Sequence, residues 1–279
     1  MLQQELIDYL LVNACNAAIL GAREIMKIYD SSNEIDVNYK SDATIITEAD
    51  TVSHNTIKRH LSQTRIPLLS EEGRNMLYEE RYSLDLYWLV DPLDGTREFV
   101  KHNGEFVVSI AFMSAAKPLF GVILQPATGR LYFSDPSRGS FLIENSLSFN
   151  EELRITDLFA HGKKLKRKVW QRGDKLRVGI TRSHLNEETK EFLEQLEQKY
   201  EDVEIVTCGS SLKFCYIAED KIDAYVRFTR LYDWDLAAGV AIAESVGANT
   251  LHLNKEKIAF NKQHLEIDGF VATFPTVEI

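Results

Sequence analysis

The stretch WLVDPLDGT at residues 88–96 constrains this chain most, because an apolar run there breaks abruptly into two acids. The run predicts a buried strand that ends at Val90, and the proline and glycine after it predict a turn. Asp91 and Asp94 should then project from the carboxyl end of the strand, where open α/β sheets bind ligands. Neighbouring carboxylates repel each other, and a hard cation such as Mg²⁺ neutralises them. For an isolated pair, a structural Asp-Pro turn is the simpler alternative.

Three further acidic stretches favour the cation site over that alternative. The stretch 70–73 contains two glutamates directly after the apolar segment 66–69, so a second strand also ends in acids. Asp235 precedes an apolar, small-residue helix that runs to about Ser245, and the free amides at such a helix start suit a phosphate. Asp50 opens another helix. Each of these acids alone could be a helix cap, which is the commoner role, but together they predict a site for cations and phosphate.

Two of these stretches, residues 91–96 and 234–239, resemble in sequence and order the two signatures of the inositol monophosphatase superfamily of metal-dependent, lithium-sensitive phosphatases. Residues 88–110 and the stretch GSSLKF at 209–214 are similar to one branch of it, the bacterial CysQ group of 3′(2′),5′-bisphosphate nucleotidases. The similarity extends from residue 40 to residue 247. It implies an α/β (α+β) fold, a layered αβαβα sandwich of the sugar-phosphatase type. That fold has an antiparallel N-terminal sheet and a smaller α/β C-terminal half.

The resemblance also implies roles for individual residues. The implied ligands of two or three Mg²⁺ ions are Glu71, Asp91, the backbone carbonyl of Leu93, Asp94 and Asp235. Asp91 would bridge two ions, and Glu71 rather than Glu72 matches the position of the family's ligand. Asp50 is implied to accept a hydrogen bond from the Thr96 hydroxyl, which orients the attacking water without a covalent phospho-enzyme.

The predicted substrate contacts come from several loops: Lys40, Gly95, Thr96, Ser183, His184, Gly209, Ser210, Ser211 and Lys213. The amides of Gly95 and Thr96 are placed to bind phosphate oxygens. Lys213 lies at a helix N-terminus, which is unfavourable for a solvated cation unless an anion binds nearby, and this favours a contact with a second phosphate. For Lys40 a solvated loop lysine is an equal alternative. The turn at 181–184 could cap a helix and also lie near the substrate.

The leading functional hypothesis is a cytoplasmic enzyme that hydrolyses the 3′-phosphate of adenosine 3′,5′-bisphosphate, with 3′-phosphoadenylyl sulfate as a further substrate. One alternative is a phosphatase of inositol phosphates or sugar bisphosphates, and another is an inactive metal- and nucleotide-binding sensor. The branch usually carries Gly-Pro-Thr before Trp-Asp, whereas this chain has FTRLYD at 228–233, so the wall of the nucleotide pocket differs.

Composition excludes several other classes. A net charge of −10 and a pI near 5.3 argue against a nucleic-acid polymer or an anionic membrane as the main partner. The partner that the family resemblance implies is a small phosphorylated nucleotide. The three cysteines lack Cys-x-x-Cys spacing, so we expect buried thiols rather than disulfides or zinc. The N-terminus lacks the basic region of a signal peptide, and no transmembrane run is expected. Peripheral contact with the inner membrane and the oligomeric state stay open.

Hydrophobic patterning predicts the order of elements. A long amphipathic helix at 2–29 and a second helix at 50–62 precede an antiparallel meander of strands at 106–113, 119–124, 130–133 and 140–143. A polar segment at 150–175 suggests a boundary between a metal-binding domain, 1–155, and an α/β domain, 156–279, that supplies Asp235. Its basic run at 163–168 could attract acidic lipid or a nucleotide tail, but solvated surface is the favoured interpretation. The remaining predicted elements are strands at 177–181, 203–206 and 222–226 and helices at 186–200 and 211–218.

Overall fold

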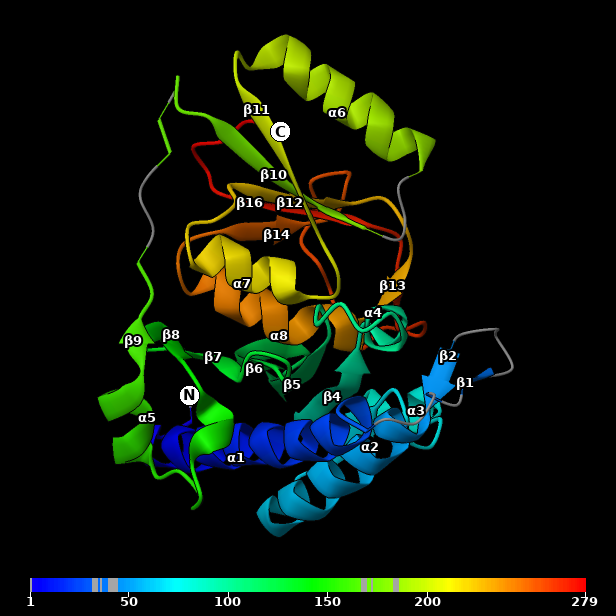
Figure 1. The fold of residues 1–279 in the computed structure, drawn as a ribbon, viewed down its shortest axis with the longest axis vertical. Helices are drawn as coiled ribbons and strands as arrows, with labels where there is room; N and C mark the ends of the chain where they lie inside the picture. The colour runs from blue at the N-terminus through cyan, green and yellow to red at the C-terminus, as the bar shows by residue number, and fades with distance from the viewer. Residues whose placement is uncertain are drawn as a thin grey trace.

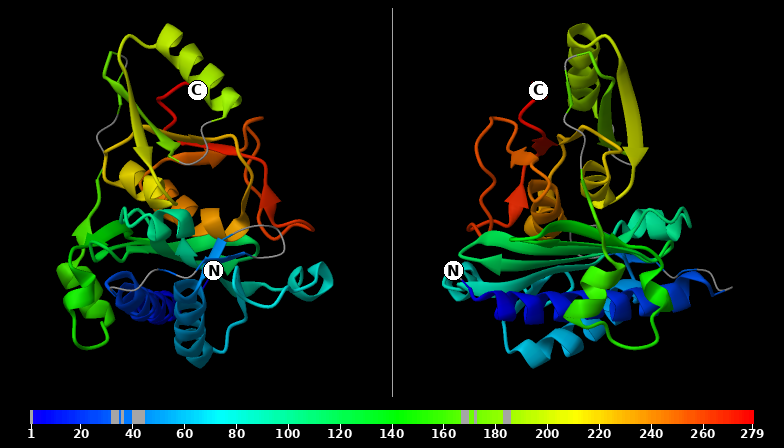
Figure 2. Two further views of the ribbon diagram at one scale, coloured as in Figure 1. Left: turned by 45° about the vertical axis from the view of Figure 1, so that its right-hand side comes forward. Right: turned by 90° about the vertical axis from the view of Figure 1, so that its left-hand side faces the viewer.

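The structure, a computed structural model, describes residues 2–31, 35, 37–39, 45–166, 170–171, 173–182 and 186–279. In this part of the chain, helices and two large sheets stack in alternating layers (Figure 1). The outer helices α1 (Gln4–Tyr29) and α2 (Glu48–Leu61) cover one face of a seven-stranded sheet. The helices α7 (Leu212–Ala218) and α8 (Asp233–Glu244) lie between that sheet and a five-stranded sheet. The far side carries α6 (Glu187–Lys199), so the predicted αβαβα sandwich is confirmed (Figure 2).

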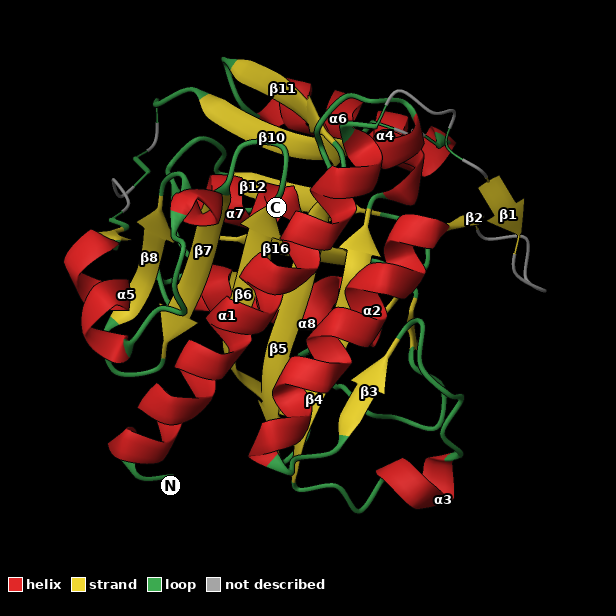
Figure 3. Cartoon of the chain, turned by 60° about the horizontal axis from the view of Figure 1, so that its bottom comes forward, coloured by secondary structure: helices red, strands yellow, loops and turns green. Residues whose placement is uncertain are grey.

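The seven-stranded sheet has its strands in chain order, as a meander requires (Figure 3). The strands are β3 (Leu68–Ser70), β4 (Leu86–Asp94), β5 (Val107–Ser114), β6 (Lys117–Gln125), β7 (Arg130–Asp135), β8 (Gly139–Ile143) and β9 (Lys163–Lys164). Pairing from β4 to β9 is antiparallel, whereas β3 pairs with β4 in parallel. The predicted meander is therefore confirmed, with one parallel edge that the expectation of an antiparallel sheet did not include.

The prediction that this strand ends at Val90 is wrong, because β4 continues through Pro92 to Asp94. Its pairing with β5 shifts register between Asp91 and Asp94. Proline cannot donate a ladder hydrogen bond, and an irregularity of this kind lets a strand continue past it. The shift places the two acids at a bend of the strand rather than on a loop beyond it.

The five-stranded sheet has the order β11-β10-β12-β16-β14. Its strands are β10 (Leu176–Thr181), β11 (Val203–Cys208), β12 (Ala224–Arg227), β14 (Asn249–Leu251) and β16 (Phe270–Thr273). The strand β10 pairs in parallel with both β11 and β12, and β16 pairs antiparallel with β12 and β14. The parallel strands β10, β11 and β12 therefore end at a common edge of this sheet.

The smaller elements connect these layers. Two short ribbons are formed by β1 (Val37–Tyr39) with β2 (Ile45–Thr47) and by β13 (Leu231–Tyr232) with β15 (Glu266–Ile267). The short helices are α3 (Tyr78–Arg81), α4 (Thr96–Val100), α5 (Ile155–His161) and the 3₁₀ turns η1 (Ser62–Thr64) and η2 (Ser146–Ser148). The helix α3 lies between β3 and β4, and the polar segment at 150–175 contains α5 and β9.

Two large apolar cores lie on either side of the seven-stranded sheet. One fills the space under α1 and α2, and the other packs α7 and α8 between the two sheets. The second core contains residues from both predicted domains, such as Met113 and Leu236, so the boundary after residue 155 stays a prediction. Gly121 of β6 lies directly against α8, where an added Cβ would be 2.2 Å from the Ala238 carbonyl oxygen. This contact presses the helix that carries Asp235 onto the sheet.

The structure shows how far the long N-terminal helix, the basic run at 163–168 and the three cysteines are buried. The helix α1 is long and apolar enough by length and composition to cross a membrane, which corrects the expectation that no run reaches this size, but 67% of its most apolar window is buried in the protein. Such burial is that of a core helix. Lys163, Lys164 and Lys166 are exposed, in agreement with a solvated basic run, while Arg167 and Lys168 lie outside the described residues. The three cysteine thiols, Cys15, Cys208 and Cys215, are free and buried, as expected.

Candidate active site

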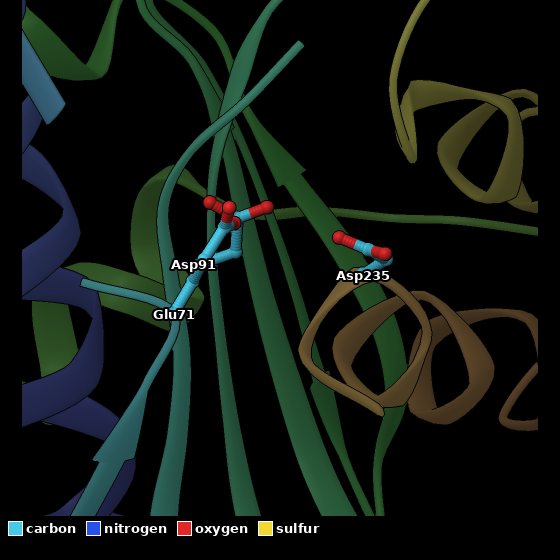
Figure 4. Close-up of side chains that lie close together, drawn as sticks. All are labelled: Glu71, Asp91 and Asp235. Atoms are coloured by element: carbon cyan, nitrogen blue, oxygen red, sulfur yellow. The ribbon is translucent and has the colours of Figure 1, made fainter. Parts of the chain in front are cut away.

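Three carboxylates from distant parts of the chain meet at the edge of the seven-stranded sheet (Figure 4). Ser70 of β3 pairs with Val90 of β4, so the next residues, Glu71 just after β3 and Asp91 within β4, lie at the same level. The helix α8 brings Asp235 toward them across the gap. One oxygen of each of these three acids lies within 4.8 Å of the others. The structure thus brings Glu71 rather than Glu72 into the group.

Asp94 lies beside this group and lines the same pocket, which has a volume of about 300 Å³. Its Oδ2 accepts a hydrogen bond of 2.5 Å from the Ser211 amide. Leu93 lines the pocket too, and its amide donates to Asp91 Oδ1 at 3.0 Å. All of the predicted metal ligands therefore border one cavity.

The acids raise one another's pKa values. Burial, followed by the charges of Glu71, Asp94 and Asp235, raises the pKa of Asp91 well above its usual value. Burial and the same kind of repulsion raise the pKa of Asp235 to about 7. Burial also raises the pKa of Asp94, although its bond from Ser211 lowers it in part. A set of buried carboxylate oxygens that repel each other in this way fits a divalent, oxygen-seeking cation such as Mg²⁺.

Asp50 and Thr96 form the predicted hydrogen bond, in which the Thr96 hydroxyl donates to Asp50 Oδ1 at 3.2 Å. The other oxygen, Oδ2, accepts from the amide of Thr47 at 2.7 Å and from its hydroxyl at 2.6 Å. Burial raises the pKa of Asp50, and its hydrogen bonds from Thr47 oppose that increase. Capping α2 and orienting Thr96 were alternatives in the sequence, but one carboxylate does both.

The predicted turn at 209–211 lies against the acids. Ser210 has a positive φ of 47°, and Lys213, at the start of α7, reaches back under the turn. The Lys213 ammonium donates to the carbonyl oxygens of Cys208 at 2.8 Å and Ser210 at 2.7 Å. Because the Lys213 side chain is only 1% exposed, the solvated-lysine alternative is wrong. Its contact with a substrate phosphate stays a prediction, as does that of the turn.

The remaining predicted contacts, Lys40, Ser183 and His184, lie outside the described residues. The pocket also contains residues that were not predicted, among them Arg227 at the end of β12. Its guanidinium donates to the Thr229 hydroxyl at 3.0 Å. Burial alone would lower the pKa of Arg227, but Tyr225, Asp235 and Asp94 raise it above its usual value. The signal was present in the sequence, because Arg227 directly follows a predicted strand, as Asp91 does.

Comparison with known proteins identifies the family. The model of the inositol monophosphatase family matches residues 6–273. This chain belongs to the inositol monophosphatase family. A relative from Buchnera aphidicola, named 3′(2′),5′-bisphosphate nucleotidase CysQ, is 41% identical over 235 residues, which are 84% of this chain and 80% of that protein. The protein of the same name from Escherichia coli K12 is 36% identical over 242 residues, covering 86% of this chain and 89% of its own length.

A solved structure agrees with the family assignment. The crystal structure of CysQ from Bacteroides thetaiotaomicron, a bacterial member of the inositol monophosphatase family, superimposes with a TM-score of 0.87 at 34% identity. The match covers 97% of this chain and 98% of that one. The resemblance of the two acidic signatures to the inositol monophosphatase family is thereby confirmed, together with the layered fold that it implied.

This family member has a second cavity next to the acidic pocket. Its volume is about 590 Å³, and it shares Glu71, Tyr232 and Trp234 with the smaller pocket. The rings of Tyr232 and Trp234 stack with centroids 5.0 Å apart. Part of its wall, at Arg74, comes from the segment between β3 and α3.

Proposed function

We propose that this chain is a Mg²⁺-dependent phosphomonoesterase that removes the 3′-phosphate of adenosine 3′,5′-bisphosphate and also accepts 3′-phosphoadenylyl sulfate. The observation that carries the proposal is the convergence of Glu71, Asp91 and Asp235, with Asp94 beside them, on one pocket. The names of the relatives at 36–41% identity agree with this substrate class. We infer a cytoplasmic location. The net charge of −10 argues against electrostatic attraction of the protein to anionic lipids of the inner membrane.

Two or three Mg²⁺ ions are the proposed cofactor. Glu71, Asp91, the carbonyl of Leu93, Asp94 and Asp235 would hold them, since these groups border the pocket and offer only oxygen ligands. When bound, Mg²⁺ supplies Lewis-acid chemistry, which lowers the pKa of water and stabilises charge on the phosphoryl group and the leaving oxygen. Such stabilisation is needed because phosphate monoesters hydrolyse extremely slowly without a catalyst.

Asp50 and Thr96 are proposed to orient the attacking water. The proton of the Thr96 hydroxyl points to Asp50 Oδ1, so the hydroxyl oxygen is left as an acceptor for a proton of water. Two hydrogen bonds from Thr47 hold the Asp50 carboxylate in place. The amides of Gly95 and Thr96 follow Asp94 directly and are proposed to bind oxygens of the phosphate that is cleaved.

The phosphate that is not cleaved requires a second positively charged region. Arg227 is a cationic side chain that lines the pocket, and the turn at 209–211 offers its hydroxyl groups nearby. We place the 5′-phosphate between Arg227 and this turn, with Lys213 acting through the turn that it holds. Lys40, Ser183 and His184 complete the proposed substrate contacts. A bisphosphate should therefore be preferred over a nucleotide with one phosphate.

A phosphate-release assay tests the function. Adenosine 3′,5′-bisphosphate, 3′-AMP, inositol 1-phosphate and a sugar bisphosphate are each offered with Mg²⁺ and with EDTA, and Asp235→Asn serves as the inactive control. We expect Mg²⁺-dependent release that is fastest from the bisphosphate nucleotide. Faster release from inositol 1-phosphate or the sugar bisphosphate would assign the chain to the rival substrate class. No release from any substrate would indicate a sensor.

A further inference from the structure

One carboxylate outside the metal site, that of Glu105, joins the two sheets at the active-site edge. Its Oε2 accepts from the amide of Gly209 at 2.8 Å and from Arg182 Nε at 3.0 Å, and its Oε1 accepts from Arg182 Nη2 at 2.8 Å. Arg182 Nη2 also donates to the carbonyl of Thr207 at 3.2 Å. Glu105 precedes β5, whereas Arg182 directly follows β10 and Thr207 lies near the end of β11. The carboxylate therefore ties the end of the five-stranded sheet to the seven-stranded one.

The backbone around this link is packed without spare room. A Cβ added to Gly209 would lie 2.6 Å from Glu98 Cγ and 2.9 Å from the Glu105 carbonyl oxygen. A Cβ added to Gly95, next to Asp94, would lie 3.1 Å from the same carbonyl oxygen and 3.2 Å from Ser210 Cβ. The turn at 209–211 thus contacts both the Glu105 segment and the segment after Asp94. A shift of the turn would be transmitted to both.

The turn at 209–211 also forms a hydrogen bond with a predicted metal ligand. The amide of Ser211 donates to Asp94 Oδ2, and Asp94 lines the acidic pocket. Gly209, held by Glu105, is two residues away from Ser211. A chain of contacts therefore runs from Arg182 through Glu105 and the turn to the carboxylate of Asp94.

We propose that Glu105 is a positioning residue, which sets the turn at 209–211 against Asp94 and so fixes the orientation of that carboxylate toward the cation. Insofar as it concerns catalysis, this inference rests on the proposed function. The ion pair itself contributes little to stability, because the side chains of Arg182 and Glu105 are 46% and 21% exposed. Variants at Glu105 should consequently fold and differ mainly in their handling of Mg²⁺.

The test compares Glu105→Ala, Glu105→Gln and Arg182→Met with the wild type. Arg138→Met is the control, because Arg138 pairs with the partly exposed Asp8 and with the buried Asp135, and none of these three residues lines the acidic pocket. The first readout is the Mg²⁺ concentration that gives half of the Mg²⁺-dependent rise in melting temperature, which needs no turnover. The second is kcat and KM for adenosine 3′,5′-bisphosphate. Loss of a group that orients a metal ligand typically costs about tenfold to a hundredfold in metal affinity or activity.

We expect Glu105→Ala to raise the Mg²⁺ midpoint and lower kcat by about tenfold to a hundredfold, with little change in KM. Glu105→Gln keeps an acceptor for the Gly209 amide, so its Mg²⁺ midpoint and its kcat should both be close to those of the wild type. Arg182→Met should raise the Mg²⁺ midpoint and lower kcat by smaller factors than Glu105→Ala does. Arg138→Met should match the wild type in both measurements. A wild-type midpoint in Glu105→Ala, or a loss confined to KM, would overturn the proposal.

Two further outcomes are separable. If Glu105→Ala fails to fold, Arg182→Met decides, because a midpoint equal to that of the wild type overturns the positioning role. If the wild type binds Mg²⁺ but hydrolyses no bisphosphate, the proposed function fails, and the midpoints alone still accept or reject the role of Glu105.

Discussion

At the scale of single residues, two acids of the site serve the backbone and the pocket at once. Asp50 uses Oδ2 to cap α2 and Oδ1 to hold Thr96. Asp235 uses its Oδ2 to accept from the Tyr232 amide at 2.7 Å, which caps α8, while the carboxylate also joins the acidic group. Each cap fixes a carboxylate that would otherwise rotate freely. A substitution that keeps the acceptor but removes the charge therefore separates the two roles.

Asp94→Asn and Asp235→Asn make that separation. We expect each to reduce turnover by more than about 10²-fold, the upper range for partners that only orient a ligand, because a negative charge for the cation is lost. Without metal, each variant should melt at or above the wild-type temperature, since one repelling charge is gone. Phosphate-release assays measure the loss of turnover, and melting curves with Mg²⁺ or EDTA measure the change in stability. Near-normal turnover would exclude the residue from the catalytic site.

The raised pKa of Asp235, about 7, predicts a pH dependence of the metal-free protein. The folded state binds this proton more tightly than the unfolded state, whose carboxyl has a pKa near 3.8, so stability falls as pH rises from about 4 to 7. Between pH 5 and pH 7.5 in EDTA, the melting temperature of the wild type should drop by at least about 2 °C more than that of Asp235→Asn. Equal drops in the two proteins would show that Asp235 is ionised throughout this range.

Lys213→Ala tests how this lysine acts. Its ammonium holds two carbonyl oxygens under the turn, so its loss should lower the free energy of unfolding by about 2–4 kcal/mol. Because the turn also holds Asp94, kcat/KM should fall by similar factors for adenosine 3′,5′-bisphosphate and for 3′-AMP. Lys221→Ala is the control, an exposed lysine beyond the same helix α7. A loss restricted to the bisphosphate, at unchanged stability, would instead assign Lys213 a direct contact with the 5′-phosphate.

At the scale of elements, the position of α8 decides whether Asp235 reaches the other acids. Gly121→Ala should push this helix away from β6, because the new methyl carbon would overlap the backbone of Ala238. We expect a destabilisation of about 1–3 kcal/mol and a higher Mg²⁺ requirement. Denaturant unfolding and Mg²⁺ titrations of activity measure the two effects. Unchanged stability would mean that α8 can slide along the sheet without cost.

The elements predicted correctly from the sequence are those whose pattern is local. The meander from β5 to β8 consists of apolar runs separated by turn residues, and α1 has a continuous helical period, so neither needs a partner to be recognised. The continuation of β4 across Pro92 depends on its neighbour β5, and the parallel β3 depends on β4. Such pairings are decided by contacts distant in the sequence, which a local pattern does not contain.

In the candidate site, too, the features predicted correctly are those marked by neighbouring residues in the chain. The acids after strands and at helix starts were found because their neighbours in the chain mark them, and the family resemblance selected Glu71 over Glu72. The burial of Lys213 and the link from Glu105 to Gly209 were not predicted, because both depend on backbone groups brought together only by the fold. Arg227 was missed although it follows a predicted strand, since a single cation there is also common as surface.

At the scale of the whole molecule, membership in the inositol monophosphatase family predicts sensitivity to lithium. We expect millimolar Li⁺ to inhibit phosphate release in an uncompetitive manner, because the ion would replace a Mg²⁺ after substrate binds but carries half its charge. A Li⁺ titration at saturating Mg²⁺ and several substrate concentrations measures this, with Na⁺ at equal ionic strength as the control. A rate that Li⁺ leaves unchanged would separate this chain from the lithium-sensitive members.

The acidic pocket also couples cation binding to the kinetics of unfolding. Glu71 directly follows β3 and Asp91 lies in β4 of the seven-stranded sheet, whereas Asp235 lies on α8, a much later part of the chain. We therefore expect the complete pocket to exist only after both parts of the chain have folded and docked. A cation that binds only this finished state slows the escape from it and leaves the rate of refolding unchanged. In the cell, Mg²⁺ would then set the lifetime of the native molecule rather than the speed at which it forms.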